Sequence, residues 1–186
     1  MATILGISGS LRRGSFNTAL LRAAVDLAPE GTTLTPETLH GVPLYDADVE
    51  AADGIPVAVA RLKEAVVAAD GLLLVTPEYN NGIPGVFKNA IDWMSRPASD
   101  IGRVFGALPV AVIGASPGGF GTILSQAAWL PVLRTLGTNP WFGGRLQVSR
   151  AGQVFAAGVL TDDGTRARLA DFVAGFAAFA ERNSRL

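Results

Sequence analysis

The chain has 186 residues, a length that fits one domain, residues 1–186, and can bury a sizeable core without disulfides or metal. Its charge is nearly balanced, with 15 Lys and Arg against 16 Asp and Glu and no long run of either sign, so we expect neither nucleic acid nor an anionic membrane as a partner. The absence of cysteine excludes disulfides, thiolate chemistry and Cys-ligated metal centres.

Short aliphatic runs alternate with helical patterns along the chain. Most of the runs are almost continuously apolar, which is typical of strands covered on both faces in a parallel sheet. Strands are predicted at residues 3–7, 32–39, 71–76, 109–114 and 140–148. Pro36 places the second of them at an edge of the sheet, because proline donates no main-chain hydrogen bond. Helices are predicted at residues 17–28, 56–69, 84–94, 122–136, with a kink at Pro131, and 163–182.

The repeated alternation of strand and helix predicts an α/β fold with a doubly wound parallel sheet. Five strands favour the flavodoxin-like order 2-1-3-4-5 over a six-stranded dinucleotide-binding sheet. In that order the winding reverses between the first and third strands. A ligand is therefore expected where the loops after those two strands meet, with the loop after the fourth strand beside them.

No targeting or membrane-spanning segment is predicted. Met1 is followed directly by a strand-like segment without a basic leader. The longest apolar stretches, such as residues 104–115, are short and are broken by Gly106 and Pro109. We therefore expect a cytoplasmic protein.

The loop after the first strand combines small, hydroxylated and basic residues directly before a helix. Gly6, Gly9 and Gly14 let a ligand approach the main chain, and N–H groups at a helix start have no partner within the helix. Further donors come from Ser8, Ser10, Ser15, Thr18 and Arg12 or Arg13. These features indicate a phosphate cradle, and an ordinary N-cap is the alternative. The dinucleotide and P-loop patterns are missing, which disfavours NAD-type dehydrogenases and NTPases.

Two further loops at the same predicted edge are polar and carry glycine. Residues 77–85 are stiffened by two prolines and can turn at their Asn-Gly pair. Main-chain N–H groups there and Asn80 can line the edge of a flat heterocycle. In residues 116–122, Gly118 and Gly119 leave room for a ring to lie against the backbone. Together the three loops predict one ligand site.

Four short motifs occur in these loops and the adjoining helices: GSLRRGSFN at residues 9–17, TPEYN at 76–80, KNAIDW at 88–93 and GGFG at 118–121. The set resembles the motifs of the NAD(P)H-dependent FMN reductase family, which includes chromate, quinone and azo-dye reductases. The match runs from the first strand to the last helix, and the shared order and spacing make it specific. The resemblance implies a flavodoxin-like fold, FMN as cofactor, and NADPH or NADH as co-substrate.

The resemblance also implies which residues hold the cofactor. The FMN phosphate is expected on the first loop, the edge of the isoalloxazine ring on the second, and Ser116 beside the ring. The implied cofactor-binding residues are Ser10, Leu11, Arg12, Arg13, Gly14, Ser15, Phe16, Asn17, Pro77, Glu78, Tyr79, Asn80, Asn81, Ser116, Gly118 and Gly119. Hydride is expected to pass from NAD(P)H to the flavin and then, in a ping-pong cycle, to a small-molecule acceptor such as a flavin, quinone, chromate or azo compound. No catalytic side chain and no metal are expected.

A flavodoxin-type electron carrier is the alternative function, since it shares the fold and the cofactor. Such carriers present strong negative charge, and the balanced charge here disfavours one. The single histidine, His40, is expected in a loop or interface, and the acidic residues between 46 and 53 in a solvated loop. Phe87, Ile91 and Met94 are expected to form a buried stripe.

The composition also predicts self-association. Apolar residues make up 49% of the chain and charged residues only 17%, which is a rich apolar content for a monomer of this size. We expect a homodimer or homotetramer, with apolar contact from the helices at 84–94 and 122–136 and the nearby tryptophans.

Overall fold

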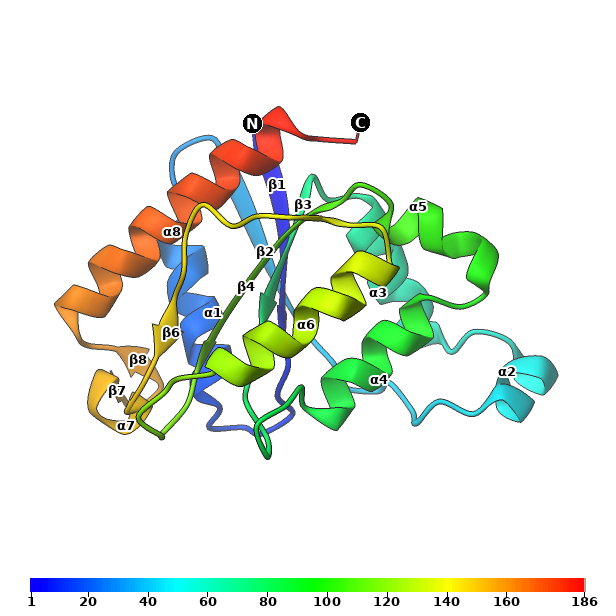
Figure 1. The fold of residues 1–186 in the computed structure, drawn as a ribbon, viewed down its shortest axis with the longest axis horizontal. Coiled ribbons are helices and arrows are strands. Elements are labelled where there is room, and N and C mark those ends of the chain that lie inside the picture. The colour runs from blue at the N-terminus through cyan, green and yellow to red at the C-terminus, as the bar shows by residue number, and fades with distance from the viewer. Residues whose placement is uncertain (186) are drawn as a thin grey trace.

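A central sheet with helices on both faces forms the protein, as Figure 1 shows for the computed structural model, which describes residues 1–185. Its strands are β1 (Ala2–Ser8), β2 (Thr32–Thr38), β3 (Gly71–Val75), β4 (Pro109–Ala115), β5 (Asn139–Pro140), β6 (Gln147–Val148), β7 (Phe155–Ala156) and β8 (Val159–Leu160). Its helices are α1 (Phe16–Asp26), α2 (Ala47–Asp53), α3 (Val57–Val67), α4 (Gly85–Met94), α5 (Ile101–Phe105), α6 (Ile123–Thr135), α7 (Ala151–Val154) and α8 (Asp163–Arg182), with a 3-10 turn at Ala98–Asp100.

The strand order is β2-β1-β3-β4-β5 with all neighbours parallel, so the predicted order is confirmed. β2 is an edge strand, and Pro36 lies in it as predicted. β3 is buried along its whole length, which explains why its sequence is a continuous apolar run.

The predicted fifth strand at 140–148 is two short strands instead. β5 pairs with the start of β4 and β6 with its end. Between them the chain folds around the Trp141 ring, since a Cβ on Gly143 would lie 2.5 Å from Trp141 Nε1. The ring itself packs edge-on against Phe172 of α8. Packing of this one side chain therefore interrupts the strand.

Two cores lie on opposite faces of the sheet. α1 and α8 cover one face, and α3, α4, α5 and α6 cover the other (Figure 1). The predicted stripe of α4 is buried, and the Phe87 ring meets Trp129 of α6 edge-on at 5.0 Å. Trp93 and Trp129 have no exposed surface, so the expectation that they contribute to contact between subunits is wrong. Both rings fill the protein's own core.

The acidic residues between 46 and 53 form helix α2 rather than the expected loop. Asp46 is its N-cap, with a carboxylate that accepts from the Asp48 N–H at 2.9 Å, and further acidic residues in the first turn suit the positive end of the helix dipole. The helix has no buried residue, and most of these carboxylates are solvated as expected. The Glu50 side chain is the exception, since it is only 14% exposed and pairs with Arg96. None of the described helices combines the length and apolar character needed to cross a bilayer.

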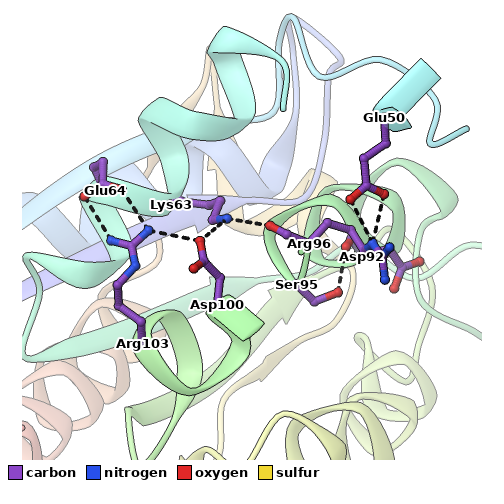
Figure 2. Close-up of polar contacts among 8 residues, drawn as sticks. All are labelled: Glu50, Lys63, Glu64, Asp92, Ser95, Arg96, Asp100 and Arg103. Atoms are coloured by element: carbon purple, nitrogen blue, oxygen red, sulfur yellow. Dashed lines mark hydrogen bonds and ion pairs between the residues drawn. The ribbon is translucent and has the colours of Figure 1, made fainter. Parts of the chain in front are cut away.

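An ionic network joins α2 and α3 to the segment from α4 to α5 (Figure 2). The buried Lys63 Nζ donates to the Asp100 carboxylate at 2.6 Å and to the Arg96 carbonyl at 2.5 Å. Other ion pairs of the network are Arg96 with Glu50, and Arg103 with Glu64 and Asp100. Hydrogen bonds from Lys63 and Arg103 lower the pKa of Asp100, and the bond from Arg96 lowers the pKa of Glu50. The network lies in the helical layer and borders neither ligand cavity described below.

Candidate functional site

The loops after β1, β3 and β4 meet at the carboxyl edge of the sheet, where the strand order reverses. They enclose a cavity of about 90 Å³ that opens to solvent. It is lined by Ser10, Arg12, Ser15, Phe16, Asn17, Pro77, Glu78, Tyr79, Ala115, Ser116 and Pro117. Most of the residues predicted from the sequence are thus brought together, although they come from three separate segments of the chain.

Both interpretations of the first loop have a basis in the structure. Ser15 is the N-cap of α1, and its Oγ accepts from the N–H groups of Asn17 and Thr18 at 3.2 Å each. The N–H groups of Arg13, Gly14 and Phe16, by contrast, have no acceptor among the described residues. These N–H groups at the positive end of the helix dipole are free to bind an anion.

The Asn17 side chain fixes the first loop to the end of β4. Its Oδ1 accepts from the Ala115 N–H at 2.9 Å, and its Nδ2 donates to the Ala115 carbonyl at 2.8 Å. Both ends of the buried amide are therefore used within the protein. Asn17 lines the cavity, yet its side chain acts as a structural bridge between two of the loops.

Glu78 connects the second loop to α6. Its Oε2 accepts from the N–H groups of Leu124 and Ser125 at 2.9 and 3.0 Å, so the carboxylate caps the start of that helix. The negative charge of Glu78 is thus compensated by the helix N-terminus. The loop reaches the cavity with a fixed orientation.

The tip of the second loop is a two-residue hairpin. Tyr79 and Gly82 exchange main-chain hydrogen bonds of 3.2 and 3.1 Å, and Asn80 and Asn81 between them have φ values of 49° and 62°. A turn of this kind needs positive φ at both central residues, which asparagine tolerates. The chain therefore turns at Asn80-Asn81, and the predicted turn at the Asn-Gly pair is displaced by one residue.

The third loop is held by its own serine. Ser116 Oγ donates to the Gly121 carbonyl at 2.6 Å, and the Ser116 N–H donates to Val148 of β6 at 2.9 Å. Gly121 has a φ of 63°, and a Cβ there would lie 2.8 Å from the side chain of Gln147. Only glycine fits this position. The loop is thus anchored on both sides before any ligand binds.

Several residues of the expected cradle serve the fold instead. A Cβ on Gly6 would lie 2.4 Å from Leu21 Cδ1, and one on Gly9 would lie 2.1 Å from Phe87 Cδ1, so these two glycines make room for core side chains. Ser8 and Thr18 bond to each other through their hydroxyls at 2.8 Å. The expectation that Gly6, Ser8 and Gly9 face a ligand is wrong, because packing and pairing already use them. Thr18, although paired with Ser8, lines the second cavity described next.

The remaining predicted residues lie around the cavity. Leu11 and Arg13 line a second cavity that shares Ser10 and Arg12 with the first. Five others are exposed and line neither cavity: Gly14, Asn80, Asn81, Gly118 and Gly119. Ala115 and Pro117 were not predicted, although both flank Ser116 and lie at the end of a predicted strand.

The donor set fits a phosphate ester with a flat ring attached. The cavity is lined by Arg12 and by Phe16, whose N–H is free, and also by Tyr79, which is 49% exposed. Glu78, the one acidic residue that lines the cavity, has its charge directed to α6. No group of three or more His, Asp and Glu among the described residues is placed to hold a metal ion.

The chain is similar to proteins of known family. The family model for NADPH-dependent FMN reductase matches residues 2–153. An NAD(P)H-dependent FMN reductase of Pseudomonas aeruginosa is 45% identical over 164 residues, 88% of this chain and 86% of that protein. A quinone reductase of Pseudomonas putida is 34% identical over 177 residues, 95% of this chain and 94% of that protein.

The solved structure of FerB, a flavoenzyme NAD(P)H:(acceptor) oxidoreductase from Paracoccus denitrificans, superposes with a TM-score of 0.86 at 36% identity. The match covers 99% of this chain and 100% of FerB, and it confirms the flavodoxin-like fold. The chain therefore belongs to the NADPH-dependent FMN reductase family, and it is an oxidoreductase that uses FMN with NADPH or NADH.

Proposed function

We propose that this protein passes two electrons from NADPH or NADH, through FMN held by the three loops, to a small-molecule acceptor. The observation that carries the proposal is the cavity at the sheet edge, which is lined together by Arg12, by Phe16 with its free N–H, and by Tyr79. A quinone is the favoured acceptor class, because relatives that match nearly the whole chain are named quinone reductases. Free flavin, chromate and azo compounds are further candidates.

In this proposal the residues of the chain bind the cofactor and orient it. The N–H groups of Arg13, Gly14 and Phe16, with the Arg12 guanidinium, would hold the phosphate of the cofactor. The hairpin with Tyr79, Asn80 and Asn81, with Ser116 and the Gly118-Gly119 backbone, would lie along the ring. FMN, when bound, supplies the hydride-accepting chemistry, so no side chain needs to act as an acid or base.

Donor and acceptor are proposed to take turns at the ring. The three loops line the cavity on the protein side, so both substrates would reach the ring from the side that opens to solvent. The proposed cycle is therefore ping-pong. Steady-state rates with NAD(P)H and a quinone should give parallel lines in double-reciprocal plots, and intersecting lines would contradict this cycle.

Anaerobic reduction tests the function itself. FMN-loaded protein mixed with NADPH or NADH without oxygen should lose its flavin absorbance, and addition of a benzoquinone should restore it. If neither nicotinamide bleaches the flavin, the oxidoreductase proposal fails in favour of an electron carrier reduced by a protein partner.

We further propose that the protein is a homodimer or homotetramer. A groove of about 290 Å³ lies between α6 and the β5–β6 segment, and Leu130 and Phe142 on its rim are 44% and 71% exposed. Such a surface is apolar enough to be covered by a second copy. Light scattering at micromolar concentration should give at least twice the monomer mass, and Leu130→Lys should lower it. A monomer mass for the unaltered chain would end this proposal.

A further inference from the structure

A second cavity lies on the far side of Arg12 from the predicted FMN site. It has a volume of about 400 Å³ and is formed by the first loop, α1 and the chain that follows β2. The polar residues that line it, besides the shared Ser10, are Arg12, Arg13, Thr18, Arg22, Thr38 and His40. The two cavities share Ser10 and Arg12 as a common wall, so a ligand in one lies next to a ligand in the other.

The cations around this cavity have no counter-charge. Arg12, Arg13 and Arg22 form no ion pair among the described residues, and none of the residues that line the cavity is acidic. Three guanidinium groups around one cavity repel one another, and a bound anion would remove that repulsion. We name the residues lining it the basic pocket.

Neutral donors complete the basic pocket. Arg22 lies one helical turn after Thr18 on α1, so both project from the same face of that helix. Across the cavity, His40 Nδ1 lies 3.2 Å from Thr38 Oγ1, which orients the ring and leaves Nε2 available. Arginine suits a phosphate in particular, because its planar group can donate two parallel hydrogen bonds.

We propose that the basic pocket binds the 2′-phosphate on the adenosine ribose of NADPH, with Arg22 and His40 as the residues that recognise it. This inference rests on the proposed function, which requires a nicotinamide dinucleotide at the neighbouring FMN site. The 2′-phosphate is the dianionic group that distinguishes NADPH from NADH. A pocket with three unpaired guanidinium groups would therefore favour NADPH over NADH.

Nucleotide binding to the FMN-loaded protein tests this assignment without turnover. By calorimetry, 2′,5′-ADP should bind about tenfold or more tightly than 5′-ADP, which corresponds to at least about 1.4 kcal/mol for the charge-assisted contacts. Arg22→Gln with His40→Gln should abolish the difference between the two nucleotides. Arg182→Gln, at an exposed position on α8 outside both cavities, should preserve it.

The same variants separate this inference from the proposed function. In Arg22→Gln with His40→Gln, FMN affinity should be unchanged, and the ratio of KM for NADPH to KM for NADH should rise about tenfold. Equal binding of the two nucleotides by the unaltered protein would overturn the inference, as would equal affinity for inorganic phosphate and 2′,5′-ADP. Loss of flavin reduction by both nicotinamides in the unaltered protein would instead contradict the proposed function.

Discussion

Two clusters of cations in this protein differ in what surrounds them. In the helical layer, carboxylates lie within 3.0 Å of Lys63, Arg96 and Arg103 (Figure 2). At the carboxyl edge of the sheet, no carboxylate pairs with Arg12, Arg13 or Arg22 among the described residues. The first cluster is neutralised within the protein and holds helices together. The second has no such pairing, which fits the anion-binding role proposed for it.

Removal of the Asn17 side chain should have the largest effect on stability. It tests whether this residue of the first loop stabilises the fold rather than binding the ligand. Asn17→Ala should lower the free energy of unfolding by about 2–4 kcal/mol, because it leaves the N–H and the carbonyl of Ala115 without their partners. Urea denaturation of the FMN-free protein measures this loss. Asn183→Ala, at the exposed end of α8, is the control and should cost little. A small loss at Asn17 would mean that its amide is not a structural bridge.

Removal of Arg12 should affect the ligand and leave the fold unchanged. Arg12→Gln should weaken FMN binding about 10- to 100-fold, the range for a hydrogen bond to a charged group. Fluorescence titration of the FMN-free protein checks the affinity, and the urea midpoint of that form should stay the same. Arg182→Gln serves as the matched control. Unchanged FMN affinity for Arg12→Gln would move the phosphate site elsewhere.

Removal of a carboxylate from the helical layer should show the opposite pattern. Asp100→Asn takes away the charge that faces the buried Lys63 Nζ, so the urea midpoint should fall while FMN affinity stays the same. Asp171→Asn, an exposed position on α8, is the control. A loss of FMN affinity in Asp100→Asn would show that the two clusters are coupled.

Acid should weaken the helical layer through the same carboxylates, with the smallest effect of the series. The pKa values of Asp100 and Glu50 are lowered in the folded protein, so each group stabilises the fold above its ordinary pKa and loses that contribution as the pH falls through its lowered pKa. The loss should begin near pH 4 to 5, the ordinary range of carboxyl groups, and should continue until the pH is below the lowered pKa values. Urea midpoints measured from pH 7 to pH 3 should fall less in Glu50→Gln with Asp100→Asn. If the urea midpoint fell equally in the variant and in the unaltered protein, the loss of stability in acid would come from other groups.

The fold could be predicted largely because its strands are buried on both faces. The apolar run of β3 and the proline in the edge strand β2 are local signals, and the rule for parallel sheets then placed three loops at one edge. The role of Asn17 could not be predicted, since its partner Ala115 lies 98 residues away. Trp129 was misplaced for a similar reason, because only the packed structure shows its ring against Phe87.

The basic pocket also escaped the sequence analysis. Arg22 lies in a helix and His40 follows an edge strand, so no motif joins them, and their shared cavity exists only once α1 has packed beside β2. The helix α2 was missed because its residues are exposed and give no apolar period. A pocket formed by residues from distant segments thus leaves no local pattern in the sequence from which it could be predicted.

Comparison of FMN with riboflavin tests the central claim most directly. The two ligands share the ring and differ in the phosphate, which the free N–H groups of Arg13, Gly14 and Phe16 and the Arg12 guanidinium are proposed to hold. Calorimetric titration of the FMN-free protein should give an affinity for FMN at least about 100-fold higher than for riboflavin, since several charge-assisted hydrogen bonds are lost together. Equal affinities would contradict the assignment of this loop as the phosphate site.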